Sequence, residues 1–173
     1  MAARVWYFSQ VSELVEYWLF GRRRLETAVE GLSDAQAEWR MHDSAHSVIE
    51  IVYHLAGAEQ YWWKRMKPAP DSDPHFDPKL ESAVFDGFLR DGACPFGGEE
   101  NSLKQCLNVY QRTGGLIRPI LELPTREQLE MRLISPFGDD VSGKEGLIRL
   151  CSHAPYHCGQ IWAMRLHPQF PKN

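Results

Sequence analysis

The sequence lacks the marks of membrane, secreted and nucleic-acid-binding proteins. No apolar run approaches the roughly 18 residues needed to span a bilayer, and the first ten residues hold too few apolar side chains for a signal-peptide core. The formal net charge is −4 and the pI is near 6.0, whereas nucleic-acid binding rests on clustered cations. The one basic run, Arg22–Arg24, would fan over about 200° of a helix, so we expect solvated helix surface there. These absences predict a soluble protein with no nucleic-acid and no membrane partner.

Paired cysteine motifs are missing as well. The four cysteines, at positions 94, 106, 151 and 158, show neither a Cys-x-x-Cys pair nor a regular spacing. Without a secretion signal, reduced thiols are the default state of such cysteines. We therefore expect a cytoplasmic protein without disulfides.

The chain does contain four long segments with helical periodicity. Its 173 residues, 43% of them hydrophobic, suit a single domain over 1–173 with a real core. Apolar residues recur every three or four positions over about 8–30, 47–66, 100–123 and 142–166. Capping boxes at Ser47 and Ser142 mark two of the helix starts. The pattern predicts an all-α fold, a four-helix bundle.

The connections between these helices differ in length. Gly31 is placed to end the first helix, and the capping box at Ser33 predicts a short helical turn after it. Residues 68–99 form a long connection with a short helix near 78–89, long enough to let the next helix run parallel to the last. Gly114, Gly115 and Pro119 predict a kink or break in the third helix. Residues 129–133 alternate as an extended segment would, and 135–140 resemble a turn.

Two histidines four residues apart stand near the end of the chain, His153 and His157. Residues at i and i+4 of a helix lie about 40° apart, so both imidazoles can meet one small object. The pair can provide two ligands to one metal ion; alternatively, the two histidines lie on a solvated or half-buried face of the helix. Ala154 replaces the glutamate of the zinc-protease motif, which excludes that class. Pro155 predicts a local bend, and the helical wheel turns Cys151 and Cys158 away from the histidines.

A third imidazole could come from His54, on the flank of the apolar sector of the second helix. A lone histidine there is also typical of the edge of a core. If the second and fourth helices are neighbours, the three imidazoles would meet at mid-bundle and form an open, catalytic type of metal centre. None of the three has a glutamate three positions before it, so the sequence does not favour a di-iron site.

Residues 39–62 and 142–161 together resemble the DinB/YfiT-like family of metal-binding helical bundles. The family pattern, one histidine in the second helix and His-x-x-x-His followed by Gly-Gln in the fourth, matches His54, His153, His157, Gly159 and Gln160. The resemblance covers essentially the whole chain and implies parallel second and third helices, a divalent metal on the three histidines, and commonly a homodimer. Pro155 and Cys158 depart from the commoner pattern, which leaves the ligands intact and the substrate open.

The resemblance also implies a range of functions. The family includes thiol-dependent transferases that use bacillithiol or mycothiol, so the leading hypothesis is a metal-dependent S-transferase acting on small electrophiles. A metal-dependent hydrolase and a non-catalytic metal-binding stress protein are the alternatives. Imidazole suits zinc, nickel, iron and copper alike. Tyr61 and Gln160 are candidates for pocket or ligand-orienting groups, or simply packing residues, and no catalytic acid or base can be named.

Overall fold

Four long helices make up most of the molecule. The structure, a computed structural model, describes residues 2–67, 73–85 and 94–172, with side chains from residue 13 onward. The long helices are α1 (Ala2–Val29), α3 (Val48–Met66), α5 (Leu103–Glu122) and α7 (Gly143–Arg165). The predicted all-α bundle is confirmed. Two starts differ from the prediction: α1 begins earlier, and α5 begins after Ser102, whose hydroxyl accepts from the Gln105 amide.

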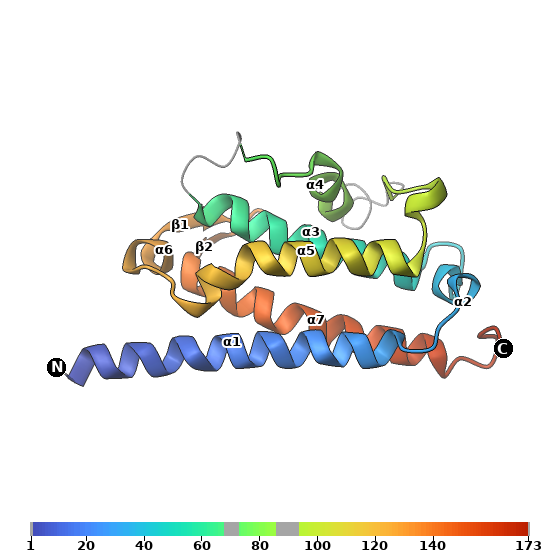
Figure 1. The fold of residues 1–173 in the computed structure, drawn as a ribbon, viewed down its shortest axis with the longest axis horizontal. Helices are drawn as coiled ribbons and strands as arrows, with labels where there is room; N and C mark the ends of the chain where they lie inside the picture. Colours follow the sequence, from blue (N-terminus) through green and yellow to red (C-terminus); the bar gives the residue numbers. More distant parts are fainter. Residues whose placement is uncertain (1, 68–72, 86–93, 173) are drawn as a thin grey trace.

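The helices run in two parallel pairs (Figure 1). α1 and α7 run in one direction, and α3 and α5 run in the other. α1 packs most extensively against α7 and α3 against α5, while α3 also contacts α7. The connection between α3 and α5 contains α4 (Pro78–Val84) and the 3₁₀ turn η3 (Gly98–Glu100). Its length permits the parallel α3 and α5, as predicted. The rest of the predicted short helix, 86–89, lies outside the described residues.

Short elements close the two ends of the bundle. α2 (Asp34–Glu38) follows the predicted capping box at Ser33, and Gly31 before it has a φ of 74°. At the other end lie α6 (Arg126–Glu130) and an antiparallel hairpin of β1 (Arg132–Ile134) and β2 (Asp140–Ser142), in which Leu133 pairs with Val141. The extended segment predicted at 129–133 is thus wrong for its first two residues, which finish a helix begun by the capping box at Thr125.

The core consists of two apolar clusters, one toward α2 and one toward the hairpin. The first includes Leu25, Ala56 and Tyr110, and the second includes Trp18, Trp62 and Ile117. Along α1, α3 and α5, the residues between these members are Arg22, Glu59 and Thr113, all buried. A polar layer therefore separates the two apolar clusters at mid-bundle.

The polar layer corrects one prediction. Arg22 is not solvated surface: it is 5% exposed and its Nη1 lies 2.5 Å from Glu59 Oε1. The Glu59 carboxylate also accepts from Trp18 Nε1 at 3.0 Å and from the Thr113 hydroxyl at 2.8 Å. Burial lowers and the Glu59 carboxylate raises the pKa of Arg22, with a net increase. A buried ion pair joins α1 to α3.

Gly114 of α5 leaves space for a side chain of α1. A Cβ at Gly114 would lie 2.6 Å from the Arg22 guanidinium carbon, so only glycine leaves room for this buried cation. Helix α5 extends unbroken from Leu103 to Glu122 despite Pro119, and α7 extends unbroken through Pro155. The predicted break in the third helix is absent from these described residues.

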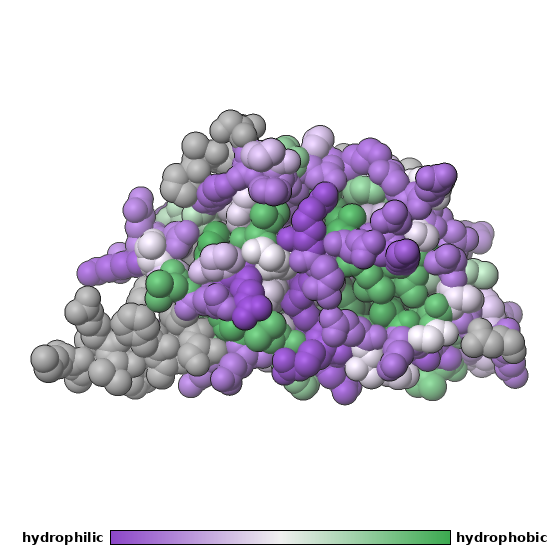
Figure 2. Space-filling view, viewed as in Figure 1, coloured by the Kyte–Doolittle hydropathy of each residue, from purple (hydrophilic) through white to green (hydrophobic). Residues whose placement is uncertain are grey.

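On the face seen in Figure 2, hydrophilic residues predominate and hydrophobic ones show between them. Among the helices that the structure describes, none is long and apolar enough to cross a bilayer.

Candidate metal site

The sequence around α7 brings its two histidines against α3. The Ser142 hydroxyl accepts from the Glu145 amide at 3.2 Å, and the Glu145 carboxylate accepts from the Ser142 amide at 2.6 Å, so the helix starts where the capping box predicts. One turn on, a Cβ at Gly146 would lie 2.5 Å from the Trp62 ring of α3. This glycine permits a close approach of α7 to α3, and His153 and His157 follow two and three turns later.

The structure brings the three predicted histidines together. His54 on α3 is 5% exposed and His157 on α7 is 2% exposed. His153 Nε2 lies 3.0 Å from His54 Nε2 and 3.0 Å from His157 Nε2. One nitrogen from each of the three rings lies within 4.8 Å of the other two. The imidazoles therefore point their Nε2 atoms at a common centre.

These distances fit a shared transition-metal ion. Nitrogens at about 2.0–2.1 Å from zinc are about 2.9 Å apart at a right angle and about 3.3 Å apart at a tetrahedral angle. The two observed separations of 3.0 Å fall in that interval. A cation can accept all three lone pairs at once, whereas hydrogen bonds among three like nitrogens need alternating donors and acceptors. The donor set fits a divalent cation and leaves further coordination positions for a substrate.

Burial keeps these imidazoles neutral. Burial, with the neighbouring His153 and His157, lowers the pKa of His54 far below its ordinary value. Burial and the neighbouring His157 lower the pKa of His153 to about 3. Burial lowers the pKa of His157 to about 4, against the opposing effect of Gln160. A neutral imidazole is the form that binds metals, so the cluster does not need to lose protons at neutral pH.

Gln160 lies where a ligand-orienting residue is needed. Its Oε1 lies 2.6 Å from His157 Nδ1. With the amide in this orientation, Nδ1–H donates to Oε1 and the lone pair of the ring resides on Nε2, which faces the cluster. The geometry favours the orienting role over simple packing for this residue.

Tyr61 lies in a different environment. It is 3% exposed, its hydroxyl donates to the Ile134 carbonyl of β1 at 2.6 Å, and the Arg65 guanidinium lies 3.3 Å from its ring centroid. It is not among the residues that line the cavity next to the histidines. Its contacts favour a packing role, holding the hairpin against α3.

A cavity of about 410 Å³ opens onto the histidines, and most of its wall is apolar. Besides the three ligand candidates, it is lined by Ala58, Trp62, Val84, Pro136, Phe137, Arg149, Leu150 and Tyr156. Phe137 and Tyr156 lie on its exposed side, at 77% and 66% exposure. The Arg149 guanidinium is fixed by Asp139, with Nη2 2.5 Å from Oδ2. Sequence reasoning missed this wall because it is assembled from α3, α4, the hairpin turn and α7.

The chain's own cysteines do not supply a reactive thiolate at this site. All four are free, and Cys151 and Cys158 are buried in the core clusters, as the helical wheel predicted. Burial raises the pKa of Cys151 to about 12 and that of Cys158 to about 11. Buried thiols with raised pKa values are poor nucleophiles, so neither residue is a candidate nucleophile for this site.

Fold and site together define a metal-binding type of helical bundle, with three convergent imidazoles beside an apolar cavity. A family model described as mycothiol-S-transferase matches residues 13–167. The chain therefore belongs to the mycothiol-S-transferase family, a DinB/YfiT-like family of thiol-dependent S-transferases. Comparison with curated proteins and with solved structures gives no match.

Proposed function

We propose that this protein joins a low-molecular-weight thiol, mycothiol in the first instance, through its sulfur to a small electrophile, with a divalent cation held by His54, His153 and His157. The observation that carries the proposal is the convergence of three neutral Nε2 atoms within 4.8 Å, in a chain of the mycothiol-S-transferase family. Zinc, nickel and iron are the candidate metals, since imidazole suits each of them.

The reaction is a substitution or addition at carbon. A divalent cation at the three imidazoles would supply a positive charge that stabilises a thiolate at neutral pH. The thiol loses its proton to solvent, and its sulfur forms a bond to the electrophilic carbon. In a substitution the leaving group departs with its bonding electrons; in an addition the π bond breaks, its electrons move to the neighbouring atom, and that atom takes up a proton from solvent. The histidines provide lone pairs without competing for that proton, and Gln160 holds the His157 ring in the required tautomer.

The cavity wall indicates the kind of electrophile. Trp62, Leu150 and Phe137 offer apolar surface next to the histidines, and an apolar wall binds an uncharged organic group and excludes water. Arg149 contributes the positive charge of this wall, partly neutralised by Asp139. We propose a small electrophile with an apolar body, positioned with its reactive carbon toward the histidines.

The cellular setting is proposed from the composition, and the oligomeric state from the family resemblance. We propose a cytoplasmic homodimer formed from a single domain over 1–173, with no nucleic-acid partner. Size-exclusion chromatography with light scattering tests the dimer, since a monomer at micromolar concentration would contradict it.

The transferase assay uses purified, metal-loaded protein, mycothiol and monochlorobimane, an apolar electrophile that becomes fluorescent on S-conjugation. We expect conjugation above the uncatalysed rate, loss of that rate with a chelator, and recovery when the metal is restored. The absence of metal-dependent thiol consumption with zinc, nickel and iron would contradict the proposal.

A matched variant separates the site from general damage. His75→Ala makes the same change at an exposed histidine of the connection before α4 and should retain the wild-type rate. His157→Ala should reduce conjugation to the uncatalysed rate. Equal rates in the two variants would exclude the histidine cluster as the active centre.

A further inference from the structure

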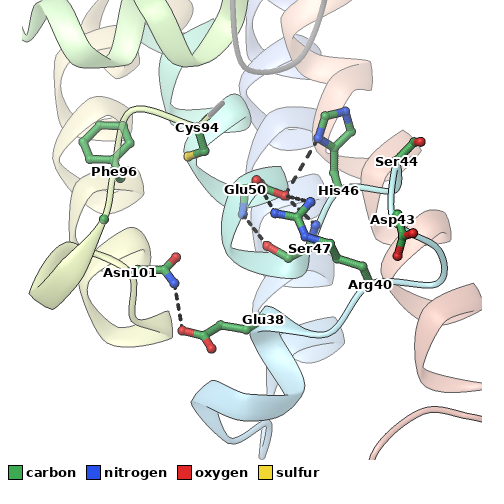
Figure 3. Close-up of a pocket in the computed structure, with 11 residues that line it drawn as sticks. Glu38, Arg40, Asp43, Ser44, His46, Ser47, Glu50, Cys94, Phe96 and Asn101 are labelled. Atoms are coloured by element: carbon green, nitrogen blue, oxygen red, sulfur yellow. Dashed lines mark hydrogen bonds and ion pairs between the residues drawn. The ribbon is translucent and has the colours of Figure 1, made fainter. Parts of the chain in front are cut away.

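A second cavity, of about 830 Å³, lies where the N-terminal end of α3 meets α2 and η3 (Figure 3). Its wall is polar, unlike that of the cavity at the histidines. Side chains that face it include Glu38, Arg40, Asp43, His46, Glu50 and Asn101. They come from α2, from the loop before α3, from α3 itself and from the segment after η3.

The wall is organised by internal ion pairs and hydrogen bonds. Arg40 donates from Nη2 to Glu50 Oε1 at 2.6 Å and from Nη1 to the Ala45 carbonyl at 2.6 Å. Asn101 Nδ2 donates to Glu38 Oε1 at 2.8 Å. His46 Nδ1 lies 3.9 Å from Glu50 Oε2. These contacts hold donors and acceptors in fixed positions around the cavity.

The charge balance selects the ligand class. Three carboxylates, from Glu38, Asp43 and Glu50, against the guanidinium of Arg40 leave the wall net negative. An anionic ligand such as a phosphate or a carboxylate would be repelled. A hydroxyl group both donates and accepts, so a neutral molecule rich in hydroxyls can use carboxylate, amide and guanidinium groups together.

Along α3, the polar cavity and the histidine cluster are lined by residues about one helical turn apart. Glu50 precedes His54 by four residues, which is about 6 Å along a helix axis. In an N-acetylcysteine amide, the sulfur and the amide nitrogen are four bonds apart, a span of roughly 5 Å. A sugar in this cavity could therefore carry a thiol to the histidines through a cysteinyl arm.

We propose that this polar cavity binds the hydroxyl-rich part of the thiol cosubstrate, the glucosaminyl-inositol unit to which the N-acetylcysteine of mycothiol is joined. The inference rests on the proposed transferase function. It assigns the two substrates to two cavities. The polar cavity binds the sugar of the thiol and the apolar cavity binds the electrophile, so that the thiol sulfur and the electrophilic carbon meet at the histidines.

The test measures binding of glucosaminyl-inositol, which contains no thiol, to metal-free protein by calorimetry. We expect saturable binding to the wild type. The double variant Asp43→Ala/Asn101→Ala removes an exposed acceptor and an amide from the wall and should weaken binding about tenfold or more, since each lost hydrogen bond is worth up to roughly a factor of ten. Glu130→Ala, an exposed carboxylate on α6 at the other end of the molecule, is the matched control and should bind as the wild type does.

Steady-state kinetics of the metal-loaded enzyme test the same assignment. The ratio of kcat/KM for mycothiol to kcat/KM for N-acetylcysteine should fall in the double variant and stay at the wild-type value in Glu130→Ala. Absence of fragment binding to the wild type, or equal binding and an equal ratio in the double variant, would overturn the assignment. Binding of the fragment to a wild type that consumes no thiol with any metal would instead overturn the transferase proposal and keep the sugar site.

Discussion

Two buried polar clusters lie in the middle of this bundle, and they are built in opposite ways. In the first, Arg22 and Glu59 pair a cation with an anion, and Trp18 and Thr113 donate to the same carboxylate. In the second, three like nitrogens of His54, His153 and His157 face one another beside a cavity. The first cluster satisfies its own charges, and the second gathers lone pairs that a cation can use.

The difference distinguishes a buried polar cluster that stabilises the fold from one that can bind a ligand. A closed ion pair connects α1 to α3, and neither Arg22 nor Glu59 lines the cavity at the histidines or the polar cavity near α2. Three neutral imidazoles stabilise one another only weakly, so their convergence indicates ligand binding and not a contribution to the stability of the fold. The ion pair lies between the two apolar clusters, whereas the histidines lie beside a cavity.

The largest expected effect is on the histidine cluster. His153→Ala removes the nitrogen that lies 3.0 Å from both of the others, so the two remaining rings cannot form a three-nitrogen site. We expect loss of metal-dependent thiol conjugation with little change in the melting temperature. Retained conjugation would show that the cluster is not the active centre. Loss of the fold would show that the cluster, like the ion pair, has a structural role.

The ion pair should respond the other way. Glu59→Gln leaves the buried Arg22 cation without its counter-charge, which costs about 3–5 kcal/mol of unfolding free energy for a buried pair. Chemical denaturation measures this loss. Glu130→Gln, which breaks an exposed pair with Arg126, should cost less than about 1 kcal/mol. Equal losses in the two variants would contradict the structural role of the buried pair.

Gln160→Leu should weaken the metal site without destroying it. The change removes the acceptor 2.6 Å from His157 Nδ1 while keeping a side chain of similar size. Loss of such an orienting partner typically lowers metal affinity about 10–100-fold. Competition with a chelator measures the affinity. Gln169→Leu, a change of the same kind beyond the end of α7, should bind metal as the wild type does; an unchanged affinity in Gln160→Leu would assign that residue to packing.

The smallest expected effect is at the rim of the apolar cavity. Phe137→Ala should lower kcat/KM for an apolar electrophile by less than about tenfold, because a side chain 77% exposed gains only part of the ~1.5–3 kcal/mol of full burial. A comparison of apolar and charged electrophiles checks this. An equal loss for both kinds would mean that the wall does not select apolar groups.

Much of the fold could be predicted because its signals are local. Capping boxes at Ser47 and Ser142 and the periodicity after them define α3 and α7, and helical geometry places His153 beside His157. The position of His54 on the second helix made it the candidate third ligand, and the family resemblance matched all three histidines. The capping box at Thr125, which begins α6, is a local signal of the same kind.

The errors concern partners that are distant in the sequence. Arg22 within a basic run suggested surface, because its carboxylate partner is 37 residues away and its space is created by Gly114 on a third helix. The hairpin needs a pairing between β1 and β2 that neither three-residue strand signals alone. Tyr61 and Gln160 looked equivalent in the sequence, and only their partners, a carbonyl of β1 and the ring of His157, distinguish them.

Metal content tests the central claim most directly. Protein prepared without a histidine tag, exposed to zinc, nickel or iron and freed of excess ion, should retain about one divalent ion per chain by elemental analysis, as a three-histidine site would. His54→Ala should retain none, and His75→Ala should retain the wild-type amount. A wild type that holds no ion, or a His54→Ala variant that holds as much as the wild type, would contradict the account.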